Sequence, residues 1–158
     1  MNNPKSATAH NSWSIRAVSR DDERRWRELY AGYAAFYRVE QTDEMASRVW
    51  GWLIDRDHAV EGIVAVDAAG SVQGLAHYRD FPRPSSASVG GYLDDLFVDS
   101  ELRGEGAADA LLADLKRIGR ERDWTVIRWI TADDNYRARG KYDQLASRTP
   151  WITYDMQP

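Results

Sequence analysis

The sequence of 158 residues has no cysteine, only three histidines and no apolar run that approaches the length of a membrane span. The missing cysteines exclude disulfides, thiolate metal ligands and a cysteine nucleophile. The histidines (His10, His58 and His77) are scattered, so we expect no metal site. The formal net charge of −4 argues against a nucleic-acid binder, which usually carries a basic surface. We therefore expect no metal, nucleic-acid or membrane partner.

The first eleven residues are polar and lack the apolar core of a signal peptide. We expect residues 1–11 to form a disordered tail and residues 12–158 to form a single domain in the cytoplasm. The chain shows no internal repeat and no linker between domains.

The most informative stretch of the chain runs from Gly91 to Ala108. Residues 92–98 have the composition of a strand, residues 99–101 break it, and the Gly-rich segment 103–108 opens a helix. The first N–H groups of a helix lack partners within the helix, so such a start can bind an anion such as a pyrophosphate. A purely structural turn is the alternative.

Strand and helix patterns alternate along the rest of the chain. Further strands are expected over 13–18, 62–66, 72–78, 125–131 and 151–156, with a loop over 81–88. Helices are expected over 21–37, from Thr42 to about Leu53, over 108–121 and over 134–146. Hairpins early in the chain and helices later imply an α/β fold, a mixed sheet with helices on both faces.

Two motifs resemble the GNAT acyltransferase superfamily. The spacing Arg103-x-x-Gly106-x-Ala108 after a strand resembles its coenzyme A pyrophosphate loop, and Tyr92–Val98 resembles the fourth strand of the polyamine- and small-amine-acetylating branch. The segment 134–142 is similar to the family's next helix. The resemblance implies a mostly antiparallel mixed sheet in which the fourth and fifth strands run parallel and splay apart.

In that family acetyl-CoA lies between the splayed strands, so the resemblance also implies cofactor contacts. It places three strand residues beside the pantetheine arm, a glycine-rich loop at the pyrophosphate, an Asn at the arm and an Arg at the 3′-phosphate. The implied residues are Leu96, Phe97, Val98, Arg103, Gly104, Glu105, Gly106, Ala107, Ala108, Asn135 and Arg139. Glu105 departs from the basic or neutral residue that the family often has there. Arg137 and Lys141 are weaker candidates for the 3′-phosphate.

Two residues are candidates for proton transfer. The resemblance makes Asp94 the base or amine-binding carboxylate and Tyr142 the general acid. Asp94 and Asp95 are neighbours on a strand, so they should point to opposite faces and only one should line the cleft. The alternatives are an ion pair for Asp94, a core role for Tyr142 and a helix cap for Asn135.

The acceptor side carries less information. Aromatic and acidic residues suit a cationic amine, and the candidates are Tyr33, Tyr37, Glu40, His77 and Tyr92. A core stripe of helix 21–37 explains the tyrosines of that helix equally well, and a single strand histidine is more often structural. Only one strand is expected after residue 146, where the family has two, which favours a homodimer.

The sequence thus predicts an N-acetyltransferase that moves the acetyl group of acetyl-CoA to a primary amine of a small molecule, such as a polyamine or amino acid, by direct attack. The alternative is a non-catalytic acyl-CoA-binding sensor or an interaction domain.

Overall fold

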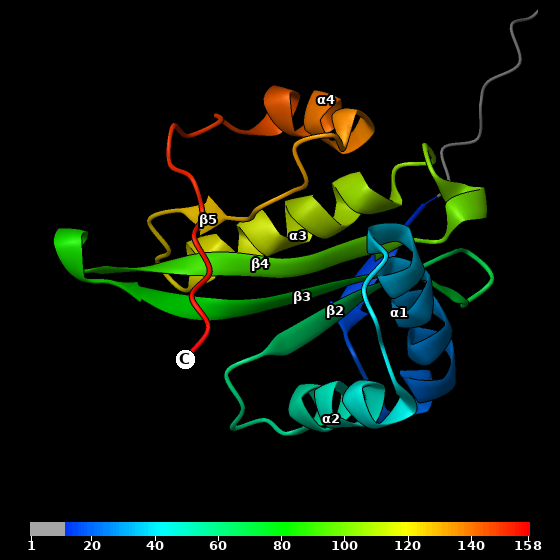
Figure 1. Cartoon of the computed structure of the whole chain (residues 1–158). Helices are drawn as coiled ribbons and strands as arrows, with labels where there is room; N and C mark the ends of the chain where they lie inside the picture. The colour runs from blue at the N-terminus through cyan, green and yellow to red at the C-terminus, as the bar shows by residue number, and fades with distance from the viewer. Residues whose placement is uncertain (1–11) are drawn as a thin grey trace, which may run out of the picture.

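A computed structural model describes residues 12–158, and the tail expected over residues 1–11 lies outside the described residues. One sheet in the order β1-β2-β3-β4-β5 forms its centre (Figure 1). The strands are β1 (Ser14–Ala17), β2 (Glu61–Val66), β3 (Val72–Arg83), β4 (Ser88–Val98) and β5 (Ile127–Arg128). Successive strands pair antiparallel up to β4, whereas β4 and β5 run parallel. This confirms the expected mixed α/β fold.

Helices cover both faces of the sheet (Figure 1). They are α1 (Glu23–Tyr37), α2 (Asp43–Ile54), α3 (Ala107–Glu121) and α4 (Tyr136–Leu145). Thr42 caps α2 by accepting a hydrogen bond from the N–H of Met45, and Asn135 caps α4 through the N–H of Ala138. Among residues 12–158 no helix is both long and apolar enough to cross a membrane.

The alternation of the central strands produces two cores. On one face α1 and α2 bury Trp26, Leu29, Trp50 and Leu53 against Leu75 and its strand neighbours. On the other face the apolar stripe of α3, which the sequence predicted, packs on alternate residues of the same strands. Burial of both faces stabilises the sheet that carries the candidate site.

A β-bulge in β4 corrects one expectation. His77 pairs with Asp95 and Tyr78 pairs with Leu93, so Asp94 is the extra residue in β4. Strict alternation is interrupted there. Asp94 and Asp95 therefore both reach side chains on one face of β3, Arg79 and His77 respectively, instead of pointing to opposite faces.

Three other expectations differ from the structure. The predicted loop 81–88 is the end of a long β3–β4 hairpin, closed by a short 3₁₀ helix (Pro84–Ser86). The expected strand 125–131 is reduced to β5, because only two of its residues pair with β4. The expected final strand 151–156 is not formed, and Trp151, Ile152, Tyr154 and Met156 are exposed. A strand composition does not by itself produce a strand, because a strand also needs hydrogen-bonding partners on a neighbouring segment.

Substitution of Gly91 tests the packing of side chains where β4 meets β5. A Cβ added there would lie 2.2 Å from two ring atoms of Trp124, a half-buried side chain that packs on the core and cannot yield easily. We expect Gly91→Ala to lower the free energy of unfolding by about 1–3 kcal/mol, the usual cost of overpacking. Gly140→Ala is the control, because nothing lies within 4 Å of its added Cβ in α4 and alanine favours a helix. Urea unfolding measures both, and equal stability of Gly91→Ala and the parent would contradict this packing.

Candidate active site

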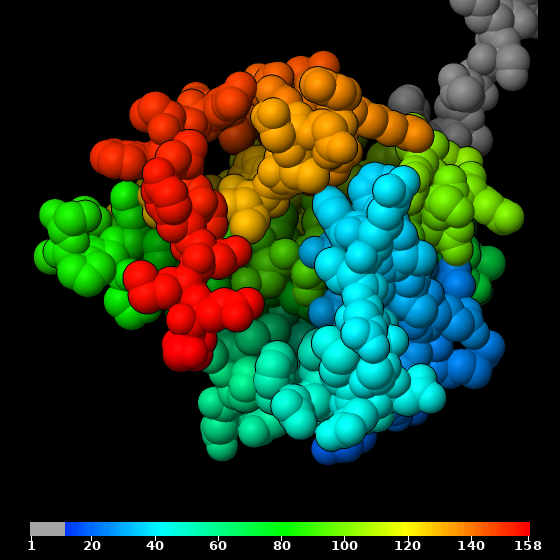
Figure 2. Space-filling model, in the orientation of Figure 1, coloured from blue at the N-terminus to red at the C-terminus, as the bar shows by residue number. Residues whose placement is uncertain are grey.

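A cavity of about 400 Å³ lies between β4, the start of α3, the end of α1 and α4. Figure 2 shows the surface hollowed between α1 and the region of α4. The side chains and backbone around it come from segments far apart in the sequence. The lining residues are Phe36, Tyr37, Leu96, Phe97, Val98, Leu102, Arg103, Gly104, Gly106, Ala107, Ala108, Asp109, Leu112, Asn135, Arg137, Ala138, Lys141 and Tyr142.

The separation of β4 from β5 provides one wall of this cavity. The two strands pair only at Gly91–Ile127 and Tyr92–Arg128, and β4 continues to Val98 without β5 beside it. Backbone N–H and C=O groups on that edge are therefore available to a ligand. An extended molecule with amide groups, placed along Leu96–Val98, would complete the edge as a strand does.

The glycine-rich loop forms the polar end of the cavity. Gly104 and Gly106 have φ values of +94° and +91°, which only glycine adopts easily, and Gly106 is the residue before α3. The indole N–H of Trp13 donates to the carbonyl of Glu105 at 2.8 Å and so ties the loop to the start of β1. The N-terminus of α3 thus faces the cavity, and its N–H groups could bind an anion there.

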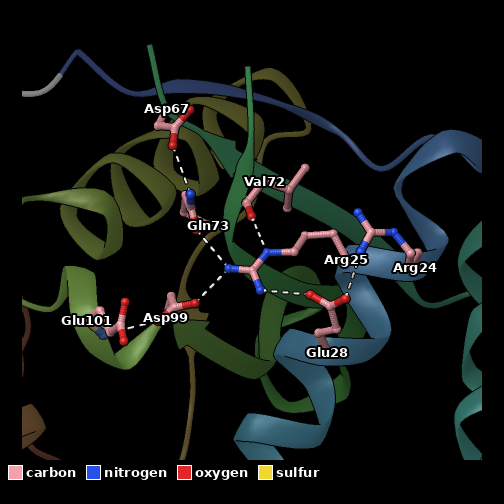
Figure 3. Close-up of polar contacts among 8 residues, drawn as sticks. All are labelled: Arg24, Arg25, Glu28, Asp67, Val72, Gln73, Asp99 and Glu101. Carbon is pink, nitrogen blue, oxygen red and sulfur yellow. Dashed lines mark hydrogen bonds and ion pairs between the residues drawn. The ribbon is translucent and has the colours of Figure 1, made fainter. Parts of the chain in front are cut away.

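Arg25 of α1 fixes the segment that leads into this loop (Figure 3). Its guanidinium donates to the Val72 carbonyl, to the Gln73 side chain and to Asp99 at 2.6 Å. Asp99 in turn accepts a hydrogen bond from the N–H of Glu101. One arginine therefore joins α1, the β2–β3 hairpin and the end of β4.

Basic side chains border the cavity. The Arg103 guanidinium lies 5.0 Å from the Phe36 ring centre, and Lys141 pairs with Asp109 at 2.8 Å. Arg137 also lines the cavity, whereas Arg139, the cation favoured from the sequence, is not a lining residue. Arg139 is bound to the backbone and side chain of Asp133.

Tyr142 lines the cavity from α4. Its ring meets Trp129 edge-on at 5.2 Å, and burial together with the neighbouring Tyr37 raises the pKa of Tyr142 to about 12. The hydroxyl is therefore protonated at neutral pH and can donate a proton. The Asn135 side chain has two roles. Its oxygen caps α4, and its nitrogen donates a long hydrogen bond of 3.4 Å to the Tyr37 hydroxyl at the cavity wall.

Asp94 lies at the bulge of β4, and neither Asp94 nor Asp95 is among the residues that line the cavity, although one of them was expected there. Both of its carboxylate oxygens accept from Arg79 Nε, at 3.1 and 3.3 Å. Partial burial nevertheless raises the pKa of Asp94 above its ordinary value, because the Arg79 charge offsets the loss of hydration only in part. A carboxylate with a raised pKa is a stronger base than an exposed aspartate.

Asp95 has the opposite environment. His77 is buried and its Nε2 accepts from the Trp26 indole at 2.9 Å, so the proton of a neutral ring lies on Nδ1 and donates to Asp95 at 2.8 Å. Burial raises the pKa of Asp95, but the hydrogen bonds from His77 and two tyrosine hydroxyls outweigh it and hold that pKa below its usual range. Asp95 is therefore ionised at neutral pH.

The tyrosines of α1 connect this carboxylate to the cavity. Tyr30 donates to Asp95 at 3.4 Å, and the rings of Tyr30, Tyr33 and Tyr37 follow one another at 5.7 and 4.8 Å. Tyr37 lines the cavity. Two predicted acceptor residues lie elsewhere. Tyr92 of β4 packs against Arg79 of β3, and Glu40 is exposed beyond the end of α1.

Some lining residues were not expected from the sequence. Phe36 and Leu112 follow the helical period of α1 and α3, which predicts core positions, and neither Leu102 nor Asp109 carries a motif of its own. Their roles depend on where the helices end in space. Only the charge of Asp109 near a helix start was a usable local signal.

Comparisons with known proteins agree with this geometry. Residues 26–146 match the sequence model of the acetyltransferase (GNAT) family. The D-amino-acid N-acetyltransferase HPA3 of Saccharomyces cerevisiae is 26% identical over 141 residues, 89% of this chain and 88% of that protein. A ribosomal-protein-alanine N-acetyltransferase structure from Brucella melitensis has a TM-score of 0.78 at 25% identity, covering 92% of this chain and 99% of the other. Aminoglycoside N-acetyltransferase AAC(6')-Iy in complex with CoA shares the fold, with a TM-score of 0.80 at 17% identity and coverage of 96% and 98%.

Asp95→Asn tests the buried hydrogen bonds. Because the pKa of Asp95 is lowered in the folded protein, its carboxylate stabilises the fold above the unfolded pKa of about 3.9, and this contribution disappears as the pH falls through the lower folded value. We expect the variant to lose about 1–3 kcal/mol at pH 7 and less near pH 3. Urea unfolding at both pH values measures this, with Asp155→Asn on the exposed C-terminal segment as the control. A loss that is equal at both pH values would contradict it.

Proposed function

Because this chain belongs to the acetyltransferase (GNAT) family, we propose that it transfers the acetyl group of acetyl-CoA to a primary amine of a small molecule. One observation carries the proposal: the free edge of β4, the N-terminus of α3 and the protonated Tyr142 meet at one cavity. An acyl thioester with a pyrophosphate and a pantetheine arm needs this combination of an amide-binding edge, an anion site and a proton donor.

The residues around the cavity fit acetyl-CoA. We propose that the N–H groups from Gly104 to Ala108, with Arg103, hold the pyrophosphate, and that Leu96–Val98 hold the pantetheine arm beside Asn135. The Glu105 backbone is kept in place by Trp13, so its side chain is not required for binding there. For the 3′-phosphate, Arg137 and Lys141 lie nearer to the cavity than Arg139, which becomes a candidate if its bond to Asp133 opens.

Acetyl-CoA supplies an activated acetyl group, and side chains of the protein move the protons. An amine is protonated at neutral pH and attacks only after it loses a proton, which we assign to Asp94, directly or through water. As the nitrogen–carbon bond forms and the carbon–sulfur bond breaks, Tyr142 gives its hydroxyl proton to the departing sulfur and regains one from the nitrogen, which becomes the amide. Asp95, held ionised, attracts the cationic acceptor toward Asp94.

We propose that the acceptor lies between Asp94 and the tyrosines of α1, with Tyr33, Tyr37 and Tyr92 forming aromatic walls. His77 acts there through Asp95, because both of its ring nitrogens are already bonded. Glu40 lies at the outer rim. The names of these relatives include D-amino acids, an aminoglycoside and a ribosomal-protein alanine as acceptors. On the Asp94–Asp95 pair we propose a small-amine acceptor, a polyamine or an amino acid, as in the polyamine- and small-amine-acetylating branch.

We also propose that the protein works as a homodimer in the cytoplasm. Support for the dimer comes from the segment after α4, where Trp151, Ile152 and Tyr154 are between 73% and 83% exposed. Apolar side chains this exposed are typical of a surface that a partner covers. In Figure 1 the segment passes in front of β3 and β4.

Acetyl-CoA binding and Tyr142→Phe test the proposal together. We expect acetyl-CoA to raise the melting temperature of both proteins, since a ligand at a hundredfold excess over its dissociation constant adds about 2.7 kcal/mol to stability. Thiol release with polyamines, amino acids and aminosugars should fall by about 10²–10⁴-fold in kcat in the variant, because the proton donor is lost. No shift at millimolar acetyl-CoA would overturn the proposal. A shift without turnover of any amine would favour the acyl-CoA sensor.

The raised pKa of Asp94 predicts the pH dependence of turnover. As the pH falls through that pKa the carboxylate gains a proton and stops acting as a base, so kcat/KM should drop at a pH above the ordinary aspartate value of about 3.9. Asp94→Asn should lower kcat about 10²–10⁴-fold and remove this acidic limb. A pH–rate profile that keeps the same limb in Asp94→Asn would assign the base elsewhere.

A further inference from the structure

Only one of the three guanidinium nitrogens of Arg79 forms hydrogen bonds within the described residues. It lies on β3 beside the bulge, its Nε donates to Asp94, and its guanidinium stacks 4.7 Å from the centre of the Tyr92 ring. Its side chain is 38% exposed. Neither terminal nitrogen, Nη1 or Nη2, forms a hydrogen bond with any part of the chain from residue 12 to residue 158. Arg79 therefore presents free donors at the Asp94 site.

A second cation lies in the same row of the sheet. Tyr92 pairs with Arg79 on one side and with Arg128 on the other, and the Arg128 guanidinium lies 5.5 Å from the Phe81 ring centre. Arg128 is exposed and forms no ion pair among the described residues. Arg122 behaves differently, because it is neutralised by both Glu61 and Asp80 on the opposite face. The face beside Asp94 thus holds two guanidinium groups: that of Arg79, paired with Asp94 through Nε alone, and that of Arg128, which forms no ion pair among residues 12–158.

This pattern of charges, two carboxylates beside two guanidinium groups, favours an acceptor that carries both charges. An ammonium group at Asp94 gains from the carboxylates but lies near the Arg79 guanidinium, so an anion on the same molecule adds a favourable contact. In an α-amino acid the ammonium and the carboxylate are on one carbon atom, so the two charges can meet the Asp94 carboxylate and the Arg79 guanidinium together. The contact of Asp94 with Arg79 at 3.1 Å keeps these two protein charges close enough for such a molecule.

We propose that the acceptor is an α-amino acid whose carboxylate is bound by the free edge of Arg79 while its amine faces Asp94 and Asp95. This rests on the acetyltransferase function proposed above and adds the substrate class. Arg79 is the specificity-determining residue, since a guanidinium edge binds a carboxylate through two parallel hydrogen bonds. Arg128 adds to the positive potential of the same face.

Matched acceptors test this on the full-length protein. Both enantiomers of a panel of amino acids are compared with their carboxamides, which keep the amine, lose the negative charge and have a lower ammonium pKa, so the comparison is made at a pH where both amines are fully deprotonated or is corrected for the deprotonated fraction. We expect the parent to prefer acids by about ten- to a hundredfold in kcat/KM, and Arg79→Gln to reduce that ratio to near one through a higher KM for the acids. The ratio of kcat/KM for acid and carboxamide is taken within each variant. Any effect of Arg79 on Asp94 as a base acts on both substrates and therefore cancels in that ratio.

Two variants and one binding measurement complete the design. Arg83→Gln removes a charge from the same face but four residues along β3, where the guanidinium bonds Thr125, so the acid preference should remain. Arg79→Lys should be intermediate. Calorimetry of the CoA-bound protein should show weaker amino-acid binding in Arg79→Gln alone.

The outcomes separate the two proposals. Turnover of carboxamides or polyamines as fast as acids, or an acid preference unchanged in Arg79→Gln, would overturn the role of Arg79 and leave the acetyltransferase function intact. No thiol release with any amine would overturn the proposed function, and the substrate class with it.

Discussion

The separation of β4 from β5 is the constraint on which the rest of the site depends. The two strands share hydrogen bonds only around Gly91 and Tyr92, although β4 continues for six more residues. Backbone groups that leave a sheet need other partners, and an extended ligand with amides is the simplest one. The cavity, the helix start behind Gly106 and the facing Tyr142 are all arranged along this opened edge.

The bulge in β4 gives two adjacent carboxylates different properties on one face. Asp95 is surrounded by donors and held ionised, whereas Asp94 is partly buried beside a single guanidinium and binds its proton more strongly. An uninterrupted strand would have placed one of them among the apolar residues beneath α3. The local irregularity therefore makes possible both a fixed charge and a base, in agreement with the frequent occurrence of bulges beside active sites.

Prediction from the sequence worked best where the signal was local. The Thr42 cap, the stripe of α3 and the glycines of the loop each depend on a few neighbouring residues, and the structure has them where they were expected. Predictions failed where a strand needed a partner. Residues 125–131 and 151–156 have strand compositions, but strand pairing is a contact between distant segments. A loop was predicted over residues 81–88 because of their prolines and serines. These residues instead contain the paired ends of β3 and β4.

The sequence by itself determined the order of the elements and the glycine-rich start of α3, because spacing and residue type carry that information. Its resemblance to the family also named Asp94 and Tyr142 as the candidate base and acid. Only the tertiary structure decided which cations border the cavity, that Asp94 and Asp95 share a face, and that Arg79 keeps free donors. Those facts depend on strand register, on the bulge and on the position of α4 relative to α3. They are properties of contacts between segments, which no local pattern contains.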